Sequence, residues 1–141
     1  MKIILNKCYG GFSVSKDGYM LYAKKKGLPL YLYESDYAGN GEFIYKKSNN
    51  DKSIFRSYFT KDFGDYAKIN NDDYEEYCLY LESKYRKDPT LIEVVEELGD
   101  KASGFCGELE VVEIPDNCYY KIDEYDGYES IYYSSTEIFI K

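Results

Sequence analysis

The segment from Cys8 to Ser13 reads Cys-Tyr-Gly-Gly-Phe-Ser and holds residue types that can bind an anion. It is expected to join a strand to a helix, where free backbone N–H groups favour phosphate. Gly10, Gly11 and Ser13 are the candidate anion-binding residues, because glycine lets a ligand approach the backbone closely. The alternative, which we favour, is a tight connection that needs glycine for its own backbone. The lysine and the spacing of a Walker loop are absent.

Cys8 is a candidate nucleophile, since Lys7 and the nearby helix terminus would favour its thiolate form. A buried structural thiol is the interpretation we favour, because no histidine is present to activate it. The other cysteines, Cys78, Cys106 and Cys118, form no Cys-x-x-Cys pair, so a zinc site is not indicated. We expect four free thiols in a reducing cytoplasm.

A second candidate is the acidic run of Asp123, Glu124 and Asp126, which lies beside Tyr125 and Tyr128. Carboxylates can bind Mg²⁺ or Ca²⁺, but this run matches no EF-hand loop. We favour a solvated hairpin tip. No two of the 26 acidic residues stand out as a pair for glycoside chemistry.

The chain of 141 residues contains no histidine, which excludes Ser-His-Asp and Cys-His catalysis and histidine-ligated zinc. It contains 19 tyrosines, whose rings offer large contact surfaces with a polar tip. No catalytic residue, metal ligand or cofactor is assigned.

Tyrosines on alternate positions of a half-buried sheet must face outward. Exposed tyrosines are enriched among the residues that contribute most of the binding free energy at protein interfaces. We expect a partner-binding surface in which tyrosines mix with acids. Its candidate residues are Tyr31, Tyr33, Tyr45, Tyr58, Tyr119, Asp123, Glu124, Tyr125, Asp126 and Tyr128. A biased genome, rich in Tyr, Lys, Asn and Ile codons, explains much of the tyrosine count but not these positions.

The net charge of −8 argues against direct DNA or RNA binding and against binding to anionic membranes. An acidic surface can instead occupy a basic groove of a host protein. No segment approaches the roughly 18 apolar residues of a membrane span, so we expect a cytoplasmic protein. Self-association through an exposed aromatic strand edge is a further expectation.

The first half of the chain predicts a strand at Lys2–Leu5 and a helix from an N-cap at Ser15 to the C′ glycine Gly27. Strands are expected at Leu30–Tyr33, Phe43–Tyr45 and Ile54–Phe59, the last two forming a hairpin. The sequence also predicts a turn from Ser35 to Gly41 and one helical turn from Asp62 to Ala67, capped by Thr60.

In the second half, Asp72–Tyr85 is compatible with a helix or a strand, and we favour the helix. Asp88 and Pro89 indicate an N-cap and N1 position, followed by an apolar stripe to Leu98. Further strands are predicted at Leu109–Ile114 and Glu137–Ile140, with a hairpin of Tyr119–Tyr125 and Tyr128–Tyr133 around Asp126-Gly127. The mixture predicts one α+β domain over residues 1–141, mostly an antiparallel twisted sheet with two or three helices on one face.

Four segments together resemble a widespread family of small uncharacterised proteins from phages and prophages. They are Lys2–Ser13, Asp88–Gly104, Val111–Asp116 and Ile122–Glu129, and they cover about a third of the chain. The departure is Ser130–Lys141, where relatives carry a basic tail with histidine and tryptophan. The resemblance implies a phage-like setting, in which small acidic proteins often act against host defences.

Three hypotheses follow, in the order in which we favour them. The first is a non-enzymatic inhibitor of a bacterial defence system, similar in role to an anti-CRISPR protein, that binds a basic, nucleic-acid-binding surface. The second is a sponge that sequesters a signalling nucleotide on aromatic faces and the Gly10-Gly11 turn. The third is a metal-dependent carboxylate enzyme, for which the sequence indicates no convergent site.

Overall fold

The computed structural model describes residues 1–39, 42–48 and 56–136. The chain folds into two compact units, each with its own core. Unit 1 is Met1–Tyr22 with Leu81–Lys141, and unit 2 is the continuous segment Ala23–Tyr80. The boundary falls inside helix α1 (Lys16–Lys26), so this helix starts in one unit and ends in the other.

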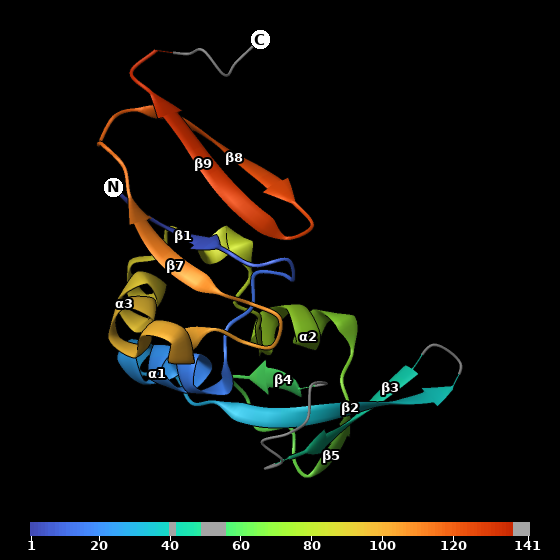
Figure 1. The fold of residues 1–141 in the computed structure, drawn as a ribbon. Coiled ribbons are helices and arrows are strands. Elements are labelled where there is room, and N and C mark those ends of the chain that lie inside the picture. The colour runs from blue at the N-terminus through green and yellow to red at the C-terminus, as the bar shows by residue number, and fades with distance from the viewer. Residues whose placement is uncertain (40–41, 49–55, 137–141) are drawn as a thin grey trace. The chain divides into compact units, whose positions relative to one another are not determined.

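Unit 1 is built on strand β1 (Lys2–Asn6), which pairs antiparallel with β7 (Leu109–Glu113). Helix α3 (Pro89–Leu98) packs on this pair, as Figure 1 shows, and buries Leu91, Ile92, Val94 and Val95. The Asp88 side chain caps α3 by accepting the N–H groups of Thr90 and Leu91, and Pro89 occupies the first turn. The predicted helix start is confirmed, and its end is the left-handed Gly99.

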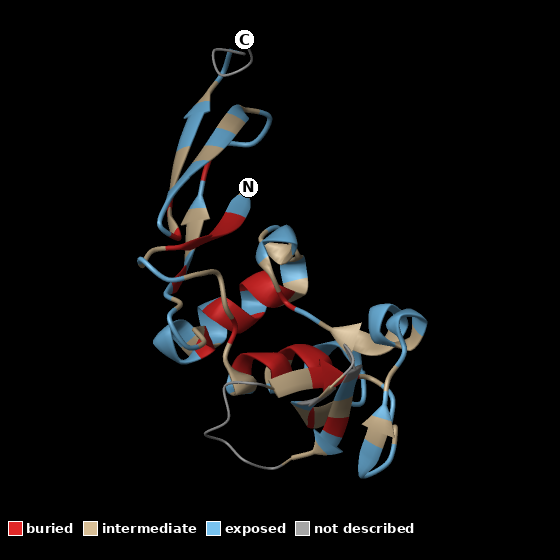
Figure 2. Cartoon of the chain, turned by 90° about the vertical axis from the view of Figure 1, so that its right-hand side faces the viewer, coloured by how far each residue is buried: buried red, intermediate tan, exposed pale blue. Residues whose placement is uncertain are grey.

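The remaining elements of unit 1 are two 3₁₀ turns and a β-hairpin. These are η1 (Ser83–Tyr85), η2 (Gly99–Ala102), β8 (Tyr119–Tyr125) and β9 (Tyr128–Ser134). The hairpin confirms the predicted one, because Asp126 and Gly127 both have positive φ, as a two-residue type I′ turn requires. Figure 2 shows buried residues gathered on β1 and α3, whereas the hairpin is largely exposed or half-buried.

Unit 2 is a five-stranded antiparallel sheet with helix α2 (Asn71–Tyr77). The strand order is β5 (Tyr66–Lys68), β3 (Glu42–Lys47), β2 (Tyr31–Gly39), β4 (Arg56–Phe59) and β6 (Cys78–Leu79). Its core is aromatic: Tyr33, Tyr45 and Phe59 are buried. The ring centroids of Tyr33 and Tyr45 lie 5.5 and 5.6 Å from that of Phe59, and both pairs are edge-to-face. The quadrupoles of aromatic rings favour this edge-to-face arrangement.

The fold class is confirmed: the chain is α+β, and the residues that the structure describes form three α-helices and antiparallel strand pairs. The strands of the described residues form three sheets. The caps of α1 are also confirmed, since Ser15 Oγ accepts the Gly18 N–H and Gly27 adopts φ +67°.

Several local predictions in unit 2 are wrong. Strands β3 and β4 do not form a hairpin with each other, because both pair with β2. Strand β2 continues from Ser35 to Gly39, where a turn was expected, and accommodates its irregular residues in a bulge. The expected helical turn over Asp62–Ala67 contains the start of β5 instead. The bulge and the pairing depend on strands distant in sequence, which local patterns do not encode.

The ambiguous stretch Asp72–Tyr85 combines both alternatives. Helix α2 is seven residues long, and the chain then extends at Cys78 to pair with β4. The predicted strand Glu137–Ile140, the last five residues of the tail Ser130–Lys141 and the start of Ile54–Phe59 lie outside the described residues. Within the described part of the chain, no helix is long and apolar enough to cross a membrane.

Candidate functional site

The structure divides the predicted tyrosine surface between the two units. Tyr33, Tyr45 and Tyr58 are 0%, 9% and 7% exposed, so the expectation that they face solvent is wrong. Tyr33 and Tyr45 pack in the aromatic core with Phe59. Tyr58 pairs in register with Leu32 and is buried on the other face of the sheet. Tyr31 is half-buried, and the Lys47 ammonium lies 5.3 Å from its ring centroid.

The predicted residues of the hairpin are exposed, except Tyr128, which is half-buried. Strand pairing places Tyr119, Asp123, Tyr125 and Tyr128 on one face, because partners in register share a face and alternate residues point the same way. Asp126 is at the turn, and exposed Glu124 belongs to the opposite face. On that opposite face, Tyr120, Ile122 and Ile131 pack against the core residues Ile3, Leu5 and Ile114. The face that bears Tyr119 and Tyr125 therefore points away from the core.

Tyr9 extends this outward face, and sequence reasoning missed it. Its ring contacts Tyr125 edge-to-face at 6.4 Å and lies 5.5 Å from Tyr128. Tyr9 and Tyr125 are nevertheless 73% and 74% exposed, so most of both rings meets water. We call this area the hairpin surface: Tyr9, Tyr119, Asp123, Tyr125, Asp126, Tyr128 and Tyr132.

The glycine turn, Cys8–Ser13, packs closely against the tip of the hairpin and against the segment around Cys106. A side chain at Gly127 would collide with the backbone of Gly10, and one at Gly10 would collide with the carbonyl of Cys106. The Gly11 N–H donates to the Cys106 carbonyl at 3.0 Å, and the Ser13 hydroxyl donates to the Phe105 carbonyl at 3.0 Å. These contacts give Gly10, Gly11 and Ser13 a structural role, and anion binding there stays a prediction.

A buried ion pair fixes the base of the hairpin. The Arg86 guanidinium donates to both carboxylate oxygens of Glu129 at 3.2 and 2.7 Å, and the two side chains are 15% and 8% exposed. Arg86 also donates to the Ile4 carbonyl, and the Asn6 N–H donates to Glu129 at 2.8 Å. The Asn6 amide donates to the Gly127 carbonyl at 2.8 Å. Because these bonds join β1 to β9, the hairpin surface rests on a rigid base.

The cysteines are free thiols in the structure. Cys8 is half-buried, and its Sγ lies 2.9 Å from the carbonyl of the exposed Cys106, whose backbone is left-handed at φ 63°. Burial raises the pKa of the Cys78 thiol, which favours the neutral form. Among the described residues, no group of three or more cysteines and carboxylates is placed to hold a metal ion.

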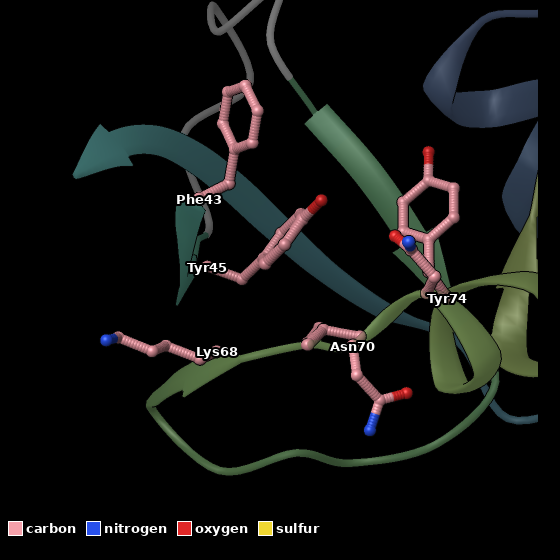
Figure 3. A pocket seen from close by; sticks show the side chains of 7 residues that line it. Phe43, Tyr45, Lys68, Asn70 and Tyr74 are labelled. Carbon is pink, nitrogen blue, oxygen red and sulfur yellow. The ribbon is translucent and has the colours of Figure 1, made fainter. Parts of the chain in front are cut away.

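Unit 2 carries a separate feature, a pocket of about 420 Å³ at the edge of its sheet. We call it the ring pocket, and it is lined by Phe43, Tyr45, Lys68, Ile69, Asn70, Asn71 and Tyr74. Figure 3 shows Phe43 and Tyr45 extending from β3 and Tyr74 standing on α2. The Tyr45 and Tyr74 centroids are 6.4 Å apart, with the rings tilted by 41°.

The phenols of this pocket stay protonated at neutral pH. Burial raises the pKa of Tyr74 to about 12, and the neighbouring Cys78 thiol adds to the effect. Burial also raises the pKa of Tyr45. Sequence patterns indicated neither pocket wall, since Phe43 and Tyr74 meet only through the sheet order β5-β3-β2 and the placement of α2.

The acidic charge is concentrated in one unit. Unit 1 contains nine basic and sixteen acidic side chains, a net charge of −7, whereas unit 2 contains nine and ten, a net charge of −1. The hairpin surface therefore belongs to a strongly acidic unit, and the ring pocket to a nearly neutral one.

Comparison of the chain with protein-family models, with curated proteins and with solved structures finds no match. The resemblance to phage and prophage proteins therefore stays a prediction.

Proposed function

We propose that the chain is a non-enzymatic binding protein whose hairpin surface docks on a basic, nucleic-acid-binding surface of a partner protein. The observation that carries the proposal is the gathering of Tyr9, Tyr125 and Tyr128 beside exposed carboxylates on a fixed hairpin. Exposed aromatic rings are enriched among residues that dominate binding energy, because they bury large areas at low entropic cost.

The chemistry of the surface favours cationic groups. The Lys7 ammonium already lies 5.3 Å from the Tyr128 ring centroid, so one ring of the surface accepts a cation from within the chain. Asp123 and Asp126 add negative charge nearby, and Asp123, whose side chain is 51% exposed, pairs with Lys121 on the same face at 3.2 Å. A partner that offers guanidinium or ammonium groups would stack on the rings and pair with these carboxylates.

The acidity of unit 1 supports the same partner. A net charge of −7 on this unit repels nucleic acid and steers the chain toward positive surfaces. With the sequence resemblance to phage proteins, these properties favour an inhibitor that occupies the nucleic-acid groove of a bacterial defence protein.

The test is affinity capture from nuclease-treated bacterial lysate, with mass spectrometry to identify the retained protein. The wild-type chain is compared with Tyr9→Ser/Tyr125→Ser, which removes the two most exposed rings of the surface. The matched control is Tyr66→Ser/Tyr80→Ser, which removes two rings of unit 2 that are 68% and 62% exposed.

We expect a basic nucleic-acid-binding protein that the wild type and the control retain and the Tyr9/Tyr125 variant loses. Retention should weaken as salt rises, because charge contributes to the encounter. The purified partner should then release its DNA or RNA when the chain is added. A captured protein that the Tyr9/Tyr125 variant retains equally well, or one that keeps its nucleic acid, contradicts the proposal.

A further inference from the structure

We propose that the ring pocket binds a planar, uncharged heteroaromatic ring, such as the base of a nucleoside. This site lies in unit 2 and is separate from the hairpin surface of unit 1. Its volume of about 420 Å³ lies within the range of small-molecule pockets in proteins. Water fills such a space at about 30 Å³ per molecule, so a bound ring would displace several waters from aromatic walls.

The walls are aromatic and keep exposed surface for a ligand. Phe43 is 48% exposed and Tyr74 38% exposed, although both line a concave site. Large apolar side chains in water recover free energy when a flat ring covers them. Every nucleobase offers a flat π-face, so stacking on phenyl and phenol rings is the contact that this chemistry provides.

The floor is held in place by the core of unit 2. Tyr45 is 9% exposed and packs edge-to-face on Phe59, and Tyr74 packs edge-to-face on the same ring at 5.8 Å. Because both tyrosines are anchored on one buried phenylalanine, their rings need little reordering when a ligand arrives. A preorganised site loses less affinity to ordering its own side chains.

The polar residues of the pocket match a base edge. The Asn71 amide contains a donor and an acceptor group, as a base edge does. The Asn70 oxygen instead accepts the Asp73 N–H at 2.8 Å and caps α2, and Figure 3 shows this amide directed away from the rings. The protonated phenols of Tyr45 and Tyr74 add hydroxyl groups without adding charge.

The charges around the pocket disfavour phosphate. Helix α2 carries four carboxylates, Asp72, Asp73, Glu75 and Glu76, within its seven residues. Lys68 does not offset them at the rings, because it pairs in register with Ile44 and so lies on the sheet face opposite Tyr45. Figure 3 shows the Lys68 amine directed away from Tyr45 and Tyr74. The ligand class is therefore the uncharged ring and not its polyphosphate.

The experiment is a titration of the ¹⁵N-labelled full chain, followed by backbone amide shifts, with adenosine and uridine as probes. Ribose and adenosine triphosphate are titrated in parallel. We expect saturable shifts at Ile69, Asn71 and Tyr74 with a nucleoside, no such shifts with ribose, and weaker binding of the triphosphate. Phe43→Ala should weaken nucleoside binding roughly tenfold, the loss of one stacking contact.

The matched control is Tyr66→Ala on the neighbouring strand β5. Tyr66 is 68% exposed, lies outside the pocket lining and faces Lys46 on the other side of the sheet. This variant should bind as the wild type does. Unchanged thermal midpoints would show that Phe43→Ala is folded. Absence of pocket shifts with both nucleosides at millimolar concentration, equal shifts with ribose, tighter binding of the triphosphate, or wild-type affinity of a folded Phe43→Ala would each overturn the proposal.

Discussion

Replacing Arg86 by methionine tests whether the ion pair at the base of the hairpin stabilises unit 1. Methionine keeps the apolar stem of the side chain and removes the guanidinium, which donates to Glu129 and to the Ile4 carbonyl. Glu129 is 8% exposed and would keep a buried charge with the Asn6 N–H as its remaining partner among the bonds described.

The size of the effect follows from that burial. Removing one partner of a buried pair costs about 3 to 5 kcal/mol, because the other charge stays without compensation. Arg86 is 15% exposed, so water reaches part of the pair and we expect the lower end, about 3 kcal/mol. With a urea slope of about 2 kcal/mol per molar, the unfolding midpoint would fall by about 1.5 M.

A second variant separates the pair from its surroundings. In Arg86→Met/Glu129→Gln, the buried charge is gone and glutamine keeps an acceptor oxygen for the Asn6 N–H. This double variant should be more stable than Arg86→Met alone by about 1 to 2 kcal/mol, since a neutral amide is less costly to bury. Lys84→Met is the matched control, because Lys84 is 69% exposed and its nearest carboxylate is 3.9 Å away. It should change stability by less than about 0.5 kcal/mol.

The assays are urea unfolding and hydrogen exchange at the Asn6 amide, which reports directly on the bond to Glu129. A loss of 3 kcal/mol corresponds to roughly a hundredfold faster exchange. A cost below about 1 kcal/mol for Arg86→Met, or a double variant no more stable than Arg86→Met, would refute the reasoning.

Four further substitutions have definite outcomes. Gly127→Ala should lower the free energy of unfolding by about 2 kcal/mol or more, because its φ is +89° and a side chain there meets the glycine turn. Gly11→Ala, where a side chain meets open space, should leave the thermal midpoint within a degree or two of the wild type. Asp88→Ala removes the cap of α3 and should cost about 1 kcal/mol in urea unfolding, whereas an unchanged midpoint would rule out a stabilising cap. Because the pKa of Tyr74 is raised from 10.0 to about 12, the folded chain holds this proton more tightly than the unfolded chain. Its contribution to stability is therefore complete below pH 10 and is lost as the pH rises toward 12; Tyr74→Phe should flatten that part of the urea-midpoint profile, and an unchanged profile would contradict the shift.

Local chemistry predicted the elements whose signals lie within a few residues. Asp88 caps its helix, and Asp126-Gly127 makes its hairpin, because a cap and a type I′ turn depend on the residues themselves. The two faces of the hairpin were not predicted, since Glu124 was expected on the same surface as Asp123 and Tyr125 and strand alternation puts it on the other face.

Long-range pairing was not predictable in the same way. Strands β3 and β4 both carry β-forming residues, but nothing local indicates that β2 lies between them. No local pattern places Tyr33 inside and Tyr9 outside, since a tyrosine side chain is stable both in a core and at a surface. The candidate site could be predicted in its hairpin part and not in Tyr9, whose neighbours come from distant segments.

The pairing of β1 with β7 has a consequence for synthesis. Of the described strands, β1 leaves the ribosome first, yet its partner residues 109–113 are made only after all of unit 2. At about 5 to 20 residues per second, translation takes many seconds to supply that partner. Until then, Ile3, Ile4 and Leu5 lack the strand that later pairs with them. The nascent chain therefore exposes an apolar segment with unpaired backbone hydrogen-bonding groups, even after all of unit 2 has been synthesised.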